Sequence, residues 1–162
     1  MQHPVITEAQ ATDILVRRKF IHSVASDNSS STTANERLIA YALRFVDSPL
    51  ADQPLQLIAR LERNIPGIAP RPKPGISLRW KGHYRIRQIS HALRHDCLLN
   101  GVPNGHVKGW HEKIWTNTDE DKFIVDVNHE IGNTDLMTMI RFCCERWNIE
   151  PLKDSLRLGD QI

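Results

Sequence analysis

Apolar residues in the first part of the chain recur at helical spacing. Thr7 to Gln10 has the pattern of a capping box, and apolar positions follow it as far as Val24. A second capping box, Thr33 to Glu36, precedes another apolar set, and Asp52 precedes a third. The third set has intervals of three residues: Leu55, Ile58 and Leu61. The pattern therefore predicts three helices within residues 1–67.

The pattern changes after residues 68–75, where every second position from Pro70 to Pro74 is proline. Such a segment is extended and stiff, so it marks a boundary between two parts of the chain. Beyond it the side chains alternate as on the two faces of a strand, with Ile76, Leu78 and Trp80 on one face and Ser77, Arg79 and Lys81 on the other. Lys81 and Gly82 fit either a hairpin turn between two short strands or a kink in one long strand.

Three further elements complete the predicted order. Residues 106–116 and 123–127 have the composition of strands, and a polar turn separates them. Asn133 or Thr134 caps a final helix, which Pro151 ends. The apolar face of this helix consists of Leu136, Ile140, Cys143 and Trp147, with Met139 beside it.

We therefore predict an α+β fold, with N-terminal helices and then a small antiparallel sheet of three or four strands with a C-terminal helix packed on it. Short turns between consecutive strands favour antiparallel pairing, and helices grouped outside the strands favour separate layers. The predicted parts are a helical N-terminal region at 1–67, a proline-rich linker at 68–75, and the sheet with its helix at 76–162.

Composition is that of an ordinary soluble globular protein. Of the 162 residues, 40% are hydrophobic and 25% are charged, and no apolar run is long enough to span a bilayer. The first ten residues lack the basic and apolar regions of a secretory signal. The three cysteines include the adjacent pair Cys143 and Cys144, which does not suggest a disulfide framework. We expect a cytoplasmic bacterial protein with no membrane partner.

The net charge of +2 hides an uneven distribution. Residues 64–95 contain seven Lys/Arg and no acidic residue, whereas residues 112–135 contain seven acidic residues and two lysines. The basic part is typical of contact with RNA or DNA, and the predicted phosphate-binding residues are Arg79, Lys81, Arg85, Arg87 and Lys108. Trp80 and Tyr84 alternate with the basic residues, so we assign them to the core rather than to base stacking. Solvated surface on two elements is the alternative.

A histidine-rich strand candidate follows the basic part, and its residues could carry chemistry. His106 and His111 have the pKa range needed for a general base and a general acid in metal-free cleavage of RNA. Glu112 could orient a histidine or take the role of the base, and Lys108 or Arg85 could stabilise charge on phosphorus. The predicted catalytic residues are therefore His106, His111 and Glu112.

Strand geometry sets a condition on this mechanism. His106 and His111 are five residues apart, so they point to opposite faces of a regular strand. A bulge at Gly109 would bring them to one face. Without it, His106, Lys108 and Glu112 share a face with an arginine of a neighbouring strand. The alternative is a sheet whose polar side chains are satisfied by one another.

The sequence does not predict a metal site. His91 and His95 would share a face if residues 90–95 were helical, and His106, His111, Cys97 or Asp96 could add ligands. The spacing HxxxH is common by chance, and the chain has no CxxC. It also has no Walker A loop, GxGxxG, GxSxG or HExxH motif, so we expect no cofactor.

Residues 78–147 resemble the small bacterial toxins of the TumE type. The matching pieces are Tyr84 to Arg87, the loop Leu99 to Gly105, and the histidine-bearing strand His106 to His111. The resemblance implies a growth-inhibiting ribonuclease encoded beside a DNA-binding antitoxin. The long N-terminal part and the acidic turn at 119–121 depart from that pattern.

These observations support three hypotheses. The first is a toxin-like, metal-independent ribonuclease from a mobile-element or defence locus, with an antitoxin as protein partner. The second is a non-catalytic module that binds nucleic acid or an acidic partner through its strand arginines. The third is an interaction protein without a nucleic-acid role, for example a phage-encoded inhibitor of a host complex, which uses the acidic residues 119–135 as a contact surface.

Overall fold

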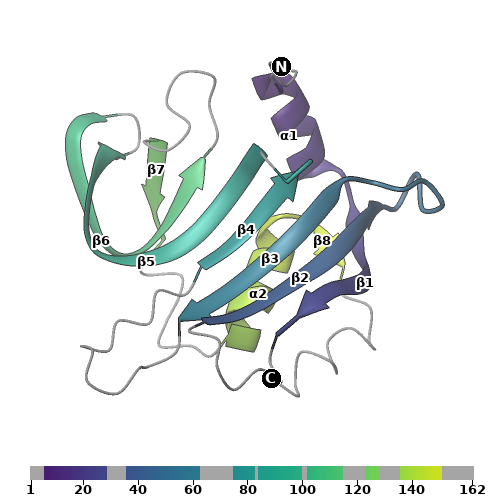
Figure 1. Ribbon diagram of the computed structural model, residues 1–162. Coiled ribbons are helices and arrows are strands. Elements are labelled where there is room, and N and C mark those ends of the chain that lie inside the picture. Colours follow the sequence, from purple (N-terminus) through teal and green to yellow (C-terminus); the bar gives the residue numbers. More distant parts are fainter. Residues whose placement is uncertain are drawn as a thin grey trace, which may run out of the picture.

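The fold is seen in a computed structural model, which describes residues 6–28, 36–62, 75–82, 84–99, 102–114, 123–127 and 136–150. The described helices are α1 (Glu8–Val16) and α2 (Leu136–Arg146). The described strands are β1 (Lys19–Asp27), β2 (Glu36–Phe45), β3 (Leu55–Glu62), β4 (Gly75–Trp80), β5 (Tyr84–Leu99), β6 (Val102–Ile114), β7 (Phe123–Asp126) and β8 (Ile149–Glu150). These strands form one sheet in the order β6-β7-β5-β4-β3-β2-β1-β8 (Figure 1).

Most of the sheet is an antiparallel meander. Each strand from β1 to β4 pairs antiparallel with the next strand in sequence, and β5 extends beyond β4 to form a long hairpin with β6. β7 pairs with both arms of this hairpin. It runs antiparallel to residues 111–113 of β6 and parallel to residues 98–99 of β5. At the other edge, β8 runs parallel to the start of β1. The sheet is therefore mixed.

The predicted fold class is wrong, because two of the three predicted N-terminal helices are the strands β2 and β3. These strands carry an alternating set of side chains that are at most 2% exposed: Ile39, Tyr41, Leu43, Phe45, Leu55, Leu57 and Ala59. Leu38 and Ile58 are half-buried on the other face, so apolar residues also recur at helical intervals. Periodicity cannot separate helix from strand where both faces are partly apolar. The described residues thus form eight strands instead of three or four.

The first capping box is confirmed, but its helix is shorter than predicted. The Thr7 hydroxyl accepts a hydrogen bond from the Gln10 N–H at 3.1 Å, and the Gln10 side-chain oxygen accepts one from the Thr7 N–H at 2.8 Å. α1 stops at Val16 because Arg17 adopts extended backbone angles. The fully buried Lys19 then turns its amine back onto three carbonyl oxygens, those of Ile14 (2.7 Å), Leu15 (2.8 Å) and Arg17 (2.5 Å).

The predicted C-terminal helix is confirmed, and it covers one face of the sheet. Figure 1 shows α2 behind the strands β2 to β4. The side chains that it buries are at most 2% exposed: Met139, Ile140, Cys143, Cys144 and Trp147. Each large apolar side chain buried here contributes about 1.5–3 kcal/mol. Its predicted cap, Asn133 or Thr134, lies outside the described residues. Neither described helix is long and apolar enough to cross a membrane.

Of the two readings of Lys81 and Gly82, the hairpin is the one observed. β4 and β5 pair antiparallel on either side of the turn, with Trp80 opposite Tyr84. Lys81 and Gly82 have φ angles of 54° and 69°, which lie in the left-handed region that tight hairpin turns use. The Lys81 N–H donates to the Pro54 carbonyl oxygen at 2.6 Å, which ties the turn to the start of β3.

The predicted proline-rich linker at 68–75 lies outside the described residues except for Gly75. β3 precedes it and β4 follows it, and the two strands pair antiparallel from Leu55 opposite Trp80 to Arg60 opposite Gly75. One sheet therefore continues across the predicted boundary.

Candidate nucleic-acid interface

The two faces of the sheet differ in chemistry. We call the face covered by α2 the helix face. The opposite face, the open face, carries polar and basic side chains from β3 to β6: Gln56, Arg60, Ser77, Arg79, Arg85, Gln88 and Lys113. The buried residues of both described helices belong to one core cluster with the helix face, so within the described ranges no helix packs on the open face.

Two arginines lie directly opposite each other on the open face, Arg79 of β4 and Arg85 of β5. We call them the arginine pair. Arg79 Nε donates to the Ser77 hydroxyl at 3.1 Å, and Arg85 Nη1 donates to the Gln88 side-chain oxygen. These hydrogen bonds help to orient both guanidinium groups. Directly opposed like charges destabilise a sheet, so the pair favours an anion beside it.

The electrostatics of the arginine pair agree with this arrangement. Partial burial lowers the pKa of Arg79, and the positive charges of Arg85 and then Arg60 lower it further. The ordinary pKa of arginine is above 12, so the group stays charged at neutral pH. A half-buried cation interacts more strongly with an anion than a fully solvated one does, because less solvent screens it. The open face therefore concentrates positive charge near the turn of the β4–β5 hairpin.

Arg87 does not lie with the arginine pair. Leu78 pairs with Arg87, whereas the next residue of β4 pairs with Arg85, so β5 has one extra residue at this point. This bulge places Arg87 on the helix face together with Leu78. Burial lowers the pKa of Arg87, the Glu112 carboxylate raises it, and Arg146 lowers it. Regular alternation had predicted Arg85 and Arg87 on one face.

The other predicted phosphate-binding residues are placed only in part. Lys81 is exposed at the turn of the β4–β5 hairpin. Lys108 and His106 lie in β6, but the side chains of residues 102–108 are outside the described part of the chain. Gly109 has a φ of 86°, and the register of β5 against β6 shifts beside it. The extra residue of that shift lies on β5, not at the predicted bulge on β6.

His111 is 2% exposed on the open face and uses both ring nitrogens. Its Nδ1 lies 3.2 Å from the Gly109 carbonyl oxygen, and its Nε2 lies 3.2 Å from the Ser90 hydroxyl oxygen. A carbonyl oxygen can only accept, so Nδ1 donates, and Nε2 of the neutral ring accepts the Ser90 proton. The imidazole is thus held in one tautomer with a hydroxyl group at its basic nitrogen.

Glu112 lies on the helix face and ties β6 to α2. Its carboxylate accepts hydrogen bonds from Arg146 Nε and Nη2, both at 3.1 Å, and from Trp147 Nε1 at 2.8 Å. Consecutive strand residues point to opposite faces, so Glu112 and His111 do not face the same ligand. The structure thus places two of the three predicted catalytic residues apart. The contacts of Glu112 are those of a residue that positions a helix.

The helical arrangement considered for a metal site is absent, because residues 90–95 belong to β5. The ring of His91 packs edge-on against Trp110, with 5.3 Å between the ring centroids. The side chains of His95, Asp96 and Cys97 are outside the described part. Across the described ranges, no group of three or more His, Cys, Asp or Glu side chains could hold a metal ion.

Several members of the open face were missed by sequence reasoning. Arg60 and Gln56 lie in β3, where a helix was predicted, and Gln88 and Lys113 reach the face only through the pairing of β5 with β6. The alternation of the exposed Arg60 with the apolar Ala59 was the one signal in the sequence that β3 is a strand. The sequence does not indicate which strands lie next to each other in the sheet.

No family model matches the chain, and no curated protein and no solved structure is significantly similar to it. The resemblance of residues 78–147 to TumE-type toxins stays a prediction. Support for a function comes from the open face and from the residues that border it.

Proposed function

We propose that this protein binds RNA or DNA through the phosphate backbone, using the open face of its sheet. The observation that supports this most is the arginine pair, two cations held side by side on neighbouring strands near the turn of the β4–β5 hairpin. Arg60 and Lys113 extend the positive charge to either side, and Gln56 and Gln88 add amide groups.

Phosphate is the anion that suits this geometry best. A guanidinium group offers a planar fork of N–H donors that binds two phosphate oxygens at once, which a lysine cannot do. A phosphate between Arg79 and Arg85 would offset their mutual repulsion, so binding gains more than either contact alone provides. Basic side chains from four strands, β3 to β6, match a polymer better than a single small anion.

Metal-free cleavage of RNA is a second candidate function. The observation that favours it is the pairing of Ser90 with the basic nitrogen of His111, which lies on the open face two strand positions from Lys113. Such a nitrogen is a competent general base. Binding and cleavage are measured in the same experiment.

The test is fluorescence anisotropy of a labelled 12-nucleotide RNA and of the matching DNA, titrated with protein at rising salt. The variant Arg79→Gln/Arg85→Gln is expected to bind at least 10-fold more weakly, because two phosphate contacts are lost. The slope of log affinity against log salt should fall by about 1.5. A denaturing gel of the same samples detects cleavage, and Ser90→Ala and His111→Gln then test the second candidate.

The matched control is Arg18→Gln/Arg141→Gln, which removes the same charge elsewhere. Arg18 pairs with Glu150 at the far edge of the sheet, and Arg141 is exposed on α2. If both double variants weaken binding equally, the open face is not the interface. An affinity that does not change with salt concentration would also contradict the proposal.

A further inference from the structure

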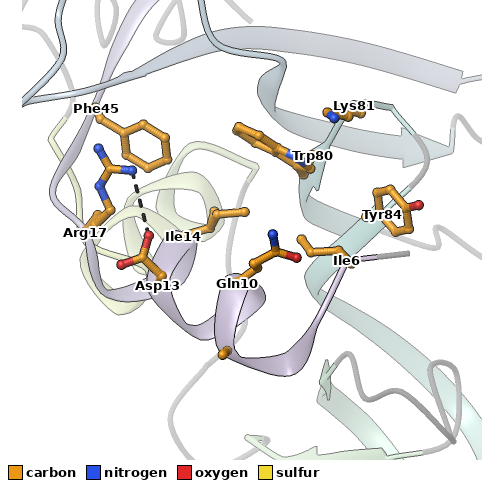
Figure 2. Close-up of a pocket in the computed structure, with 10 residues that line it drawn as sticks. Ile6, Gln10, Asp13, Ile14, Arg17, Phe45, Trp80, Lys81 and Tyr84 are labelled. Atoms are coloured by element: carbon orange, nitrogen blue, oxygen red, sulfur yellow. Dashed lines mark ion pairs between the residues drawn. The ribbon is translucent and has the colours of Figure 1, made fainter. Parts of the chain in front are cut away.

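A pocket of about 440 Å³ lies between α1 and the end of the β4–β5 hairpin (Figure 2). Three aromatic side chains line it, Phe45, Trp80 and Tyr84, and Ile6 and Ile14 add apolar surface. Phe45 is buried, whereas Trp80 and Tyr84 are only half-buried. The volume lies in the range of pockets that hold small planar molecules, roughly 300–1,000 Å³.

Polar groups converge on the same pocket from α1. The capping box holds the side-chain oxygen of Gln10 on the Thr7 N–H, and Figure 2 shows its amide nitrogen pointing into the pocket. The Arg17 guanidinium lies 3.7 Å from the centre of the Phe45 ring and is 3.8 Å from the Asp13 carboxylate. The pocket therefore offers both donors and an acceptor beside its aromatic wall.

The pocket and the arginine pair share one hairpin. Arg79 precedes Trp80 and Tyr84 precedes Arg85, so the aromatic residues and the arginines occupy opposite faces of the same strand ends. Lys81 sits at the turn between the two faces and also lines the pocket. A chain that lies on the arginine pair reaches the pocket by passing around this turn.

We propose that the pocket receives one unpaired base of the nucleic acid whose phosphates lie on the open face, so that the ligand is single-stranded. This inference rests on the proposed function. Stacking on an aromatic side chain contributes about 1–3 kcal/mol per base. A base edge carries donors and acceptors, which match Gln10, Arg17 and Asp13.

The same geometry disfavours duplexes. A base inside a duplex is already stacked and paired, and its removal costs a few kcal/mol. The free strand has no such cost. Trp80 and Tyr84, which the sequence assigned to the core, thereby acquire a role as a stacking surface.

The experiment compares four probes with the native chain and three variants. The probes are a single-stranded 12-nucleotide RNA, its duplex, inorganic polyphosphate of similar charge, and uridine monophosphate. The variants are Trp80→Leu, Trp80→Phe and the control Phe20→Leu, which removes an aromatic ring from the other edge of the sheet. Urea denaturation confirms that each variant is folded.

The native chain is expected to prefer the single strand to the duplex and to polyphosphate. Trp80→Leu should weaken RNA binding about 10-fold while polyphosphate binding is unchanged. Trp80→Phe should retain most of the RNA affinity, and Phe20→Leu all of it. Uridine monophosphate should not displace the RNA, because it lacks the contacts of the chain with the arginine pair.

Three results would overturn the inference while the proposed function stands: equal binding of RNA and polyphosphate, equal binding of duplex and single strand, or full RNA affinity in Trp80→Leu. Displacement of RNA by uridine monophosphate would also overturn it, since the pocket would then be a site for free nucleotides. If neither RNA nor polyphosphate binds the native chain, the proposed function itself fails.

Discussion

Replacing Glu112 with alanine is expected to lower the free energy of unfolding by about 3 kcal/mol. The Glu112 side chain is 6% exposed, and it accepts hydrogen bonds from Arg146 and Trp147 of the C-terminal helix region. Its removal leaves the buried indole N–H of Trp147 without an acceptor and leaves Arg146 without this carboxylate. Urea denaturation followed by far-UV circular dichroism measures the change.

Two controls distinguish the loss of these three hydrogen bonds from a general loss of charge. Glu112→Gln retains an oxygen that accepts from Trp147, so it should cost roughly half as much. Glu145→Ala removes an exposed carboxylate from α2 and should change stability by less than about 0.5 kcal/mol. A Glu112→Ala protein as stable as the native chain would contradict the structural role. Glu112 would then return to the set of catalytic candidates.

The second large effect is expected at Lys19. Lys19→Met should lower the free energy of unfolding at pH 7 by about 2–3 kcal/mol, because carbonyl oxygens at the end of α1 lose their buried donor. Arg18→Met is the matched control, since it removes the same charge from the neighbouring exposed position and should cost at most about 1 kcal/mol. Equal losses in the two variants would show that charge, not the helix cap, is responsible.

The pH dependence of this loss has a definite sign. Burial, and after it the positive charge of Arg17, lower the pKa of Lys19 from 10.5 to about 8, whereas Asp13 opposes the shift. Between these two values the unfolded chain binds more protons at Lys19 than the folded chain, so this residue makes stability rise with pH. The stability difference between the native chain and Lys19→Met should therefore grow by about 1–2 kcal/mol from pH 7 to pH 9.5. A difference that shrinks over this range would refute the depressed pKa.

Elements with a complete local signal were predicted correctly from the sequence. The reciprocal hydrogen bonds of Thr7 and Gln10 involve residues three apart, and the apolar face of α2 repeats over three turns. β2 and β3 lack such a signal, because their alanines and leucines are good helix formers. Their strand conformation depends on pairs such as Tyr41 with Leu57, which lie in different segments of the chain. Tertiary pairing decided the structure there.

In the candidate site, too, features with a local sequence signal were predicted and features set by strand pairing were missed. Arg79 and Arg85 were found because they belong to a clear alternating pattern close to a turn. Arg87 was assigned to their face because a single bulged residue is invisible in composition and spacing. The partner of Glu112 was equally hidden, since Arg146 comes 34 residues later in the chain. Chemistry could be predicted from residue type, but the grouping of the residues depends on register.

The late position of α2 in the chain has a consequence for synthesis on the ribosome. The strands β1 to β5 follow one another, so their hairpins can form as soon as these residues emerge. The apolar residues that α2 covers stay exposed until residues 100–135 and α2 itself have been made. At ~5–20 residues per second, residues 100–135 alone take roughly 2–7 s. For that time the apolar side of these strands lacks the helix that covers it in the folded protein.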